Sequence, residues 1–120
     1  MSVSKNYYVI AGCDLTPYRT SKYDDFKWTP EGEQLTHYQQ KGRIQFFNDP
    51  MDGRYLYLGY ILACGDEYDF PTVKFNMKTF AMQEQYVRDK IKQLVISGIL
   101  SPEACSMGIK YEIIVFEECT

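Results

Sequence analysis

The sequence predicts an α+β fold in which a mainly antiparallel sheet of about four strands packs against one long amphipathic helix. Several stretches alternate apolar residues with other residues at a period of two, which is typical of strands. Another stretch repeats apolar residues every three or four positions, which is typical of a helix that covers a core. With 120 residues, 45% of them hydrophobic, the chain is expected to form one domain over residues 1–120.

The first predicted strand covers residues 6–15, where aromatic and β-branched residues alternate with other residues. A polar, aromatic segment without this alternation follows. After it, a short helix is expected over residues 30–38. Its start is indicated by the Thr29 hydroxyl as a cap, by Pro30 at the first helical position and by Glu31 near the positive end of the helix dipole.

Two further strands, 42–47 and 54–63, are expected around a turn in which Pro50 fixes its φ angle and Gly53 accepts a positive φ. The second strand is partly apolar on both faces, which indicates a central strand or a strand at an interface with another molecule. One face carries Leu56, Leu58, Tyr60 and Leu62, and the other carries Tyr55, Tyr57 and Ile61.

The clearest helix is predicted over residues 77–98, and Gly98 is expected to end it in a left-handed conformation. A capping pattern at residues 101–103 indicates one further helical turn. Alternation over residues 109–116 then predicts the last strand. The apolar stripe of the long helix consists of Met77, Phe80, Val87, Ile91, Leu94 and Gly98.

Charge and cysteine content exclude several classes of function. Thirteen basic and sixteen acidic residues give a net charge of −3, and without a basic face we expect no general binding of nucleic acid. No segment is apolar enough for a signal peptide or a membrane span, so the chain is expected in the cytoplasm, with reduced thiols and no membrane contact. Four scattered cysteines are interpreted as small buried hydrophobic residues: Cys13, Cys64, Cys105 and Cys119.

No motif predicts an enzyme, a metal site or a cofactor. The hydrolase motif GxSxG, the zinc-protease motif HExxH and the glycine-rich nucleotide cradles are absent from the sequence. His37 is the single histidine, and it would be the first residue to test for catalysis. The acids Asp66, Glu67 and Asp69 lack the flanking ligand series of a calcium loop, so we interpret them as a solvated turn.

The first candidate binding surface is the segment 18–28, which is rich in aromatic and cationic residues. Arginine, tyrosine and tryptophan dominate the binding energy of many protein interfaces. The alternative interpretation is a loop folded over one end of the sheet, with Phe26 and Trp28 as plugs. The residues with the strongest binding chemistry in this segment are Arg19, Lys22, Tyr23, Lys27 and Trp28.

A second candidate surface surrounds the predicted hairpin. Arg43 and Arg54 could hold a phosphate or a carboxylate beside the aromatic faces of Tyr55 and Tyr57. Ordinary cross-strand pairing of these residues explains the same pattern. The acids Asp66, Glu67 and Asp69 form a third candidate surface, which could enter a protein groove built for phosphates.

Three stretches, YYVIAGCDLT, KGRIQFFNDPMDGRYLYLGYILA and YEIIVFEECT, carry a resemblance that spans most of the chain. The chain resembles small early-region proteins of phages and prophages of low-GC Gram-positive bacteria. The resemblance implies a protein that binds and blocks a host factor, as anti-CRISPR proteins, restriction blockers and sponges for immune nucleotide signals do. Asn48 departs from the more acidic turn of such relatives, which weakens any role for a carboxylate there.

Three hypotheses of function follow. The first is a non-enzymatic inhibitor that binds a host protein, such as a bacterial defence nuclease, through segment 18–28 and the acids of the C-terminal half. The second is a sponge for a small nucleotide signal, in which aromatic rings stack on a base and an arginine meets a phosphate. The third is a small enzyme that uses His37. The apolar residues on both faces of strand 54–63 also suggest a homodimer.

Overall fold

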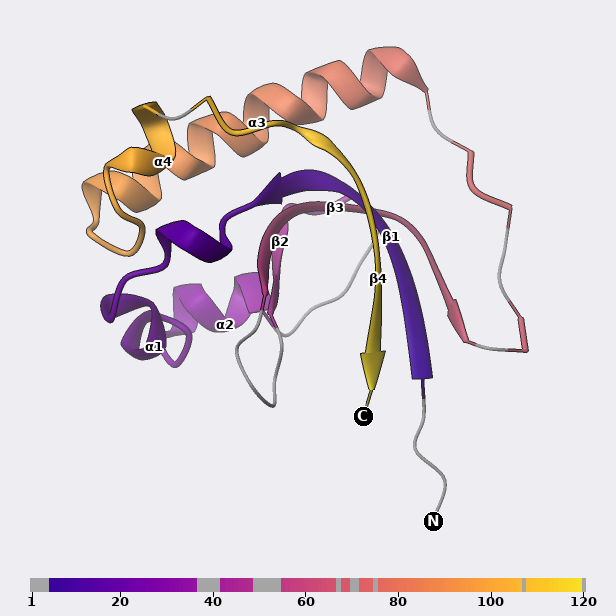
Figure 1. Cartoon of the computed structure of the whole chain (residues 1–120), viewed down its shortest axis with the longest axis horizontal. Coiled ribbons are helices and arrows are strands. Elements are labelled where there is room, and N and C mark those ends of the chain that lie inside the picture. Colours follow the sequence, from indigo (N-terminus) through magenta and orange to yellow (C-terminus); the bar gives the residue numbers. More distant parts are fainter. Residues whose placement is uncertain are drawn as a thin grey trace.

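The computed structural model has the α+β fold that the sequence predicts, with a four-stranded antiparallel sheet and one long helix (Figure 1). It describes residues 5–36, 42–48, 55–66, 68–69, 72–74, 76–106 and 108–119. The elements are β1 (Lys5–Asp14), η1 (Thr16–Tyr18), α1 (Lys22–Phe26), α2 (Pro30–Thr36), β2 (Gln45–Asn48), β3 (Leu56–Asp66), α3 (Met77–Ile96), α4 (Glu103–Ser106) and β4 (Glu112–Cys119).

The strands lie in the order β2-β3-β1-β4, and each neighbouring pair is antiparallel. The central strands are therefore β1 and β3, and β3 is the strand whose apolar faces indicated a central or interfacial position. Its residues Leu58 and Ile61, on opposite faces, are both buried within the chain. The structure thus accounts for the pattern without a second molecule and removes this argument for a dimer.

Two glycines face each other at the centre of the sheet. Gly12 of β1 pairs with Gly59 of β3. A Cβ atom on Gly59 would meet the carbonyl oxygen of Ala11 and lie 2.7 Å from the Cα atom of Gly12, and a Cβ atom on Gly12 would meet the carbonyl oxygen of Leu58. The two strands therefore approach here more closely than side chains permit.

The sheet curls strongly around one of its faces. Phe47 in β2 and Phe116 in β4 lie on opposite edge strands, yet their ring centroids are 5.7 Å apart. In a flat sheet the two intervening strands would separate these edges by about 14 Å, at roughly 4.8 Å per strand. Curling therefore brings the edge strands together and creates a second, smaller core, formed by Tyr8, Ile10, Phe47 and Ile61.

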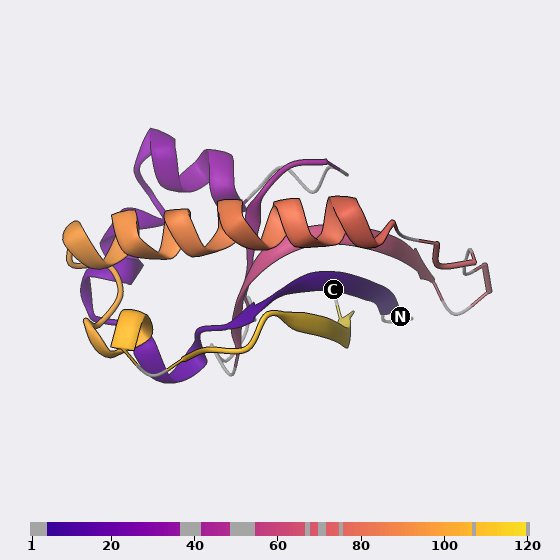
Figure 2. The same ribbon diagram turned by 90° about the horizontal axis from the view of Figure 1, so that it is seen from above.

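Helix α3 lies across the other face of the sheet (Figure 2). Val87, Ile91 and Leu94 are its buried residues, and they belong to the main core. After the helix, Gly98 has a φ angle of 81°, which confirms the left-handed end that the sequence predicts. The predicted apolar stripe is therefore confirmed in the C-terminal half of α3.

The N-terminal part of that stripe is not buried as predicted. Met77 is 69% exposed, and Phe80 is half-buried against the ring of Tyr111, with 4.8 Å between the ring centroids. The spacing of apolar residues defines one side of a helix, but contact with the sheet decides how much of that side is covered. The first turns of α3 extend past the main core.

The segment after β1 contains a helix that the sequence pattern did not predict. With five residues, α1 is too short to display a helical period, and its one buried residue is Tyr23. The next helix, α2, begins as expected, because the backbone N–H of Gly32 donates to the Thr29 hydroxyl at 3.1 Å. Residues 37 and 38 of the predicted helix, and the predicted turn with Pro50 and Gly53, lie outside the described residues.

Candidate functional site

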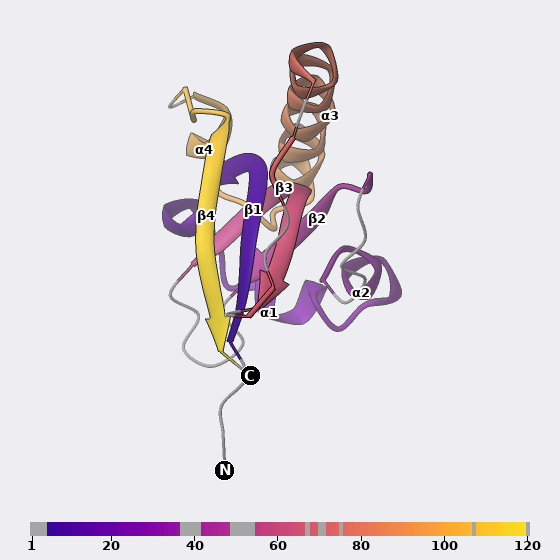
Figure 3. The same ribbon diagram turned by 90° about the vertical axis from the view of Figure 1, so that its right-hand side faces the viewer.

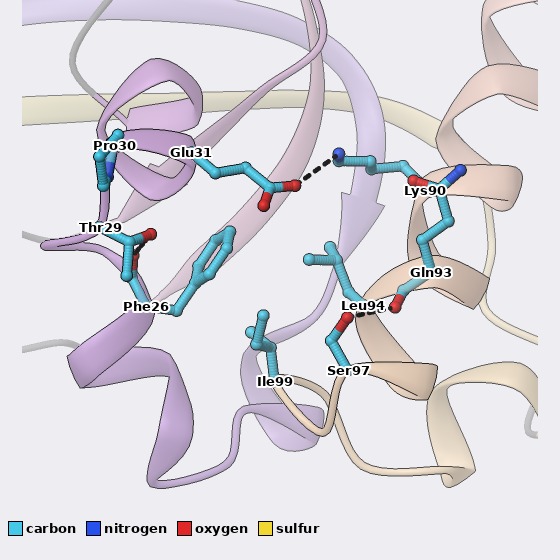
Figure 4. A pocket seen from close by; sticks show the side chains of 9 residues that line it. All are labelled: Phe26, Thr29, Pro30, Glu31, Lys90, Gln93, Leu94, Ser97 and Ile99. Atoms are coloured by element: carbon cyan, nitrogen blue, oxygen red, sulfur yellow. Dashed lines mark hydrogen bonds and ion pairs between the residues drawn. The ribbon is translucent and has the colours of Figure 1, made fainter.

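A groove of about 570 Å³ lies between the α1–α2 segment and the C-terminal half of α3 (Figure 4). Its floor is apolar. Leu94 of α3 and Ile99, just beyond that helix, are buried, and Phe26 of α1 is half-buried beside them. Segments about seventy residues apart in the sequence therefore build one surface.

The rim of the groove is polar and crosses from one helix to the other. The ammonium nitrogen of Lys90 in α3 lies 3.8 Å from a carboxylate oxygen of Glu31 in α2. The Ser97 hydroxyl donates to the backbone carbonyl of Gln93 at 3.0 Å. Because the ion pair spans the opening, a ligand that enters here meets both a positive and a negative charge. The remaining lining residues are Thr29 and Pro30.

The segment that carries the first wall is fastened to the end of α3. The Thr20 hydroxyl lies 2.7 and 2.8 Å from the carbonyl oxygens of Gly98 and Ile99. The backbone N–H of Thr20 also donates to the carbonyl oxygen of Ile99, at 3.2 Å. The backbone N–H of Ser101 donates to the carbonyl oxygen of Tyr18 at 2.8 Å. These contacts hold α1 beside α3, so the groove has two fixed walls.

The predicted binding residues of segment 18–28 separate into core and surface. Tyr23 is fully buried, which corrects its assignment to a binding surface, and its hydroxyl has no hydrogen-bond partner among the described residues. Burial raises the pKa of this hydroxyl well above its usual value. Of the two plugs in the alternative interpretation, Phe26 is half-buried and packs against the main core, whereas Trp28 is 68% exposed.

The exposed part of this segment holds one aromatic ring among charges. The Lys27 ammonium lies 5.7 Å from the centre of the Trp28 ring and 3.8 Å from a carboxylate oxygen of Asp24. Lys22 is exposed and Arg19 is half-buried. Trp28 stands in the sequence between Phe26 and Thr29, which both line the groove. Trp28 is therefore next to the groove along the chain without lining it.

The structure describes part of the second predicted surface. Tyr55 and Tyr57 do stack, with 5.0 Å between their ring centroids, but both rings also contact Phe116. Phe47 pairs with Tyr57, and Arg43 lies four residues before Phe47, toward the other end of the hairpin. The two tyrosines therefore pack on an aromatic neighbour. The second guanidinium, that of Arg54, lies outside the described residues.

The acids after β3 have a local structural role. One carboxylate oxygen of Asp66 accepts from the backbone N–H groups of Tyr68 and Asp69, at 2.9 and 2.8 Å. This carboxylate closes a turn, as interpreted from the sequence, and Asp66 and Asp69 border a second cavity of about 400 Å³. Within the described ranges, no cluster of histidine, cysteine or acidic residues could hold a metal ion. Glu67 and His37 lie outside those ranges.

The cysteines differ from the prediction that all four are buried. Cys13 is buried in the main core, and burial raises the pKa of its thiol to about 11. Cys64 and Cys105 are exposed instead. Cys64 lies near the end of β3, and Cys105 lies in the short helix α4, so both are away from the middle of the main core. The side chain of Cys119 is outside the described part.

Sequence reasoning missed the α3 wall of the groove. Lys90, Gln93 and Ser97 fall outside the predicted apolar stripe, and only the docking of α1 and α2 makes them line a groove. Comparisons of the chain with protein-family models, curated proteins and solved structures gave no match. None of the helices in the described ranges combines the length and apolar character that a membrane span requires.

Proposed function

We propose that this protein is a non-enzymatic binding protein that blocks a host factor in the bacterial cytoplasm, such as an immune nuclease. The groove between α1–α2 and α3 supports this proposal. Protein interfaces typically combine an apolar centre with a polar rim, and the groove has both, with Leu94 and Ile99 in its floor and the Lys90–Glu31 pair across its opening.

Exposed Trp28 gives the proposed interface its anchor. Tryptophan is the residue most often found among the few that carry the binding energy of an interface, because it buries a large area with little loss of conformational freedom. We expect the change Trp28→Ala to weaken binding by about 2 kcal/mol, which is about 30-fold in the dissociation constant. Because Trp28 is 68% exposed in the free protein, this change leaves the fold intact.

The test is affinity capture from a lysate of a low-GC Gram-positive bacterium, followed by mass spectrometry. The wild-type protein is expected to retain one stoichiometric protein through a salt wash. Gln93→Trp fills the groove and should abolish capture. Gln85→Trp is the matched control, since Gln85 is exposed on the same helix about 12 Å away at 1.5 Å per residue and does not line the groove.

Two outcomes would contradict the proposal. In the first, Trp28→Ala and Gln93→Trp retain the same proteins as the wild type. In the second, no protein is retained, and a nucleotide at saturating concentration raises the melting temperature of the pure protein. Stabilisation by mass action would then identify a nucleotide sponge. If a nuclease is captured, the wild-type protein should inhibit cleavage of nucleic acid by that nuclease, in proportion to the fraction of the nuclease that is bound.

A further inference from the structure

Strand β4 forms an open edge of the sheet. Among the described strands, β4 is paired through its backbone with β1 alone, and its Phe116 ring reaches the second core; the opposite edge strand, β2, is short and is covered by α2. Figure 3 shows β4 along the side of the sheet that faces away from α2 and α3. The alternate backbone N–H and C=O groups that point outward from an edge strand are free to pair with another strand.

Apolar side chains of β4 lie uncovered beside this edge. Ile113 pairs with Ala11 and Val115 pairs with Val9, so both belong to the face of the sheet on which α3 lies. They are nevertheless 42% and 67% exposed, because α3 covers β1 and β3 and does not extend over β4. A strand added next to β4 would place its own alternate side chains against these two residues and remove them from water.

Acidic residues flank this apolar stretch. Glu112 precedes it, Glu117 follows it, and both are exposed. Like charges directly opposite each other across two strands are destabilising, and opposite charges are stabilising. A strand that carries lysine or arginine on either side of apolar residues therefore matches β4 in both charge and hydrophobicity.

The same charges argue against a second copy of this chain. In an antiparallel pair of β4 strands centred on Val115, the residue opposite Glu112 is Glu118 of the other copy. Such a register places acids opposite acids at both ends of the pair. Charge complementarity thus favours a different partner over self-association.

We propose that β4 is a docking edge for an extended, cationic segment of a partner protein, which adds to the sheet as a fifth strand. Main-chain hydrogen bonds would supply affinity in this mode, and the pattern of side chains would supply specificity. This inference concerns a surface other than the groove between α1–α2 and α3. Either surface can therefore fail its test while the other passes.

The test uses a synthetic peptide that alternates valine and threonine between lysine pairs, and a matched peptide with glutamates in place of the lysines. Each is titrated into the isotope-labelled protein and followed by NMR and by hydrogen exchange. The lysine peptide should protect backbone amides of β4 and bind at least tenfold more tightly than the glutamate peptide. The double change Glu112→Lys and Glu117→Lys should reverse that order.

A control variant separates local charge from net charge. Asp24→Lys with Glu33→Lys makes the same change in net charge on exposed residues of α1 and α2, and it should leave the preference for the lysine peptide in place. Equal binding of the two peptides, or the absence of new protection in β4, would overturn the proposal. It would also be overturned if the free protein is a dimer in which the outward amides of β4 are already protected.

Discussion

At the scale of single residues, the pair Gly12 and Gly59 sets how closely the two central strands approach. The change Gly59→Ala is expected to lower the free energy of unfolding by about 3 kcal/mol, because the new methyl group collides with the backbone of β1. The accompanying loss of freedom in the unfolded chain favours folding by at most about 1 kcal/mol, so the collision dominates. Urea denaturation at neutral pH measures the difference.

Gly108→Ala is the matched control for this prediction. Gly108 has a φ angle of 62°, and a Cβ atom there would have no neighbour within 4 Å. Gly108→Ala should therefore lower the free energy of unfolding only by the strain of an alanine in the left-handed conformation, about 1 kcal/mol. Equal losses for the two variants would show that the close approach of β1 and β3 is not what requires glycine at position 59.

Residue type alone could not separate Tyr23 from Trp28. Both were predicted as binding residues, and tryptophan, the more hydrophobic of the two, was the alternative plug. The structure buries Tyr23 and exposes Trp28, because α1 presents one residue to the core and ends before Trp28. A segment with neither a strand period nor a full helical period gives no indication of which side faces inward.

At the scale of secondary-structure elements, the exposed first turns of α3 depend on their cap. The side-chain oxygen of Asn76 accepts from the backbone N–H groups of Lys78 and Thr79, at 2.8 and 3.4 Å. Asn76→Ala should lower the free energy of unfolding by about 1 kcal/mol and accelerate hydrogen exchange in the first turn. Asn76→Asp keeps a hydrogen-bond acceptor at this position and should retain the free energy of unfolding of the wild type. If Asn76→Asp is destabilised as much as Asn76→Ala, the side-chain cap does not stabilise α3.

The types of the elements and their order along the chain followed from the sequence, but the order of the strands in the sheet and the groove did not. Alternation identified all four strands, and the spacing of Val87, Ile91 and Leu94 identified the buried side of α3. The groove needs α1 and α2 to dock beside that buried side, through contacts such as those of Thr20 with Gly98. Contacts between segments this far apart leave no periodic trace in either segment.

At the scale of the whole molecule, the ionisable groups buried in the main core predict a loss of stability at alkaline pH. The thiol of Cys13 has a pKa raised from 9.0 to about 11 by burial, and burial also raises the pKa of the Tyr23 and Tyr111 hydroxyls above 10.0. Between these values the unfolded chain has released protons that the folded chain still holds. The free energy of unfolding should therefore be insensitive to these groups below pH 9 and fall as the pH rises above it.

Cys13 accounts for the first part of this fall. A difference of about two pKa units between folded and unfolded states corresponds to about 3 kcal/mol, which is lost between pH 9 and pH 11. Urea denaturation in the presence of a reductant, at pH 8, 9, 10 and 11, measures how the free energy of unfolding falls with pH.

Two variants assign this fall to particular groups. Cys13→Ala should be less stable at pH 8, because it leaves a small cavity, yet its free energy of unfolding should fall less steeply up to pH 10. Tyr23→Phe should weaken the pH dependence only above pH 10. Because it removes a buried hydroxyl that has no partner among the described residues, it should cost no stability at pH 8. If the free energy of unfolding falls with pH equally in the wild type and in both variants, the alkaline transition arises outside the main core.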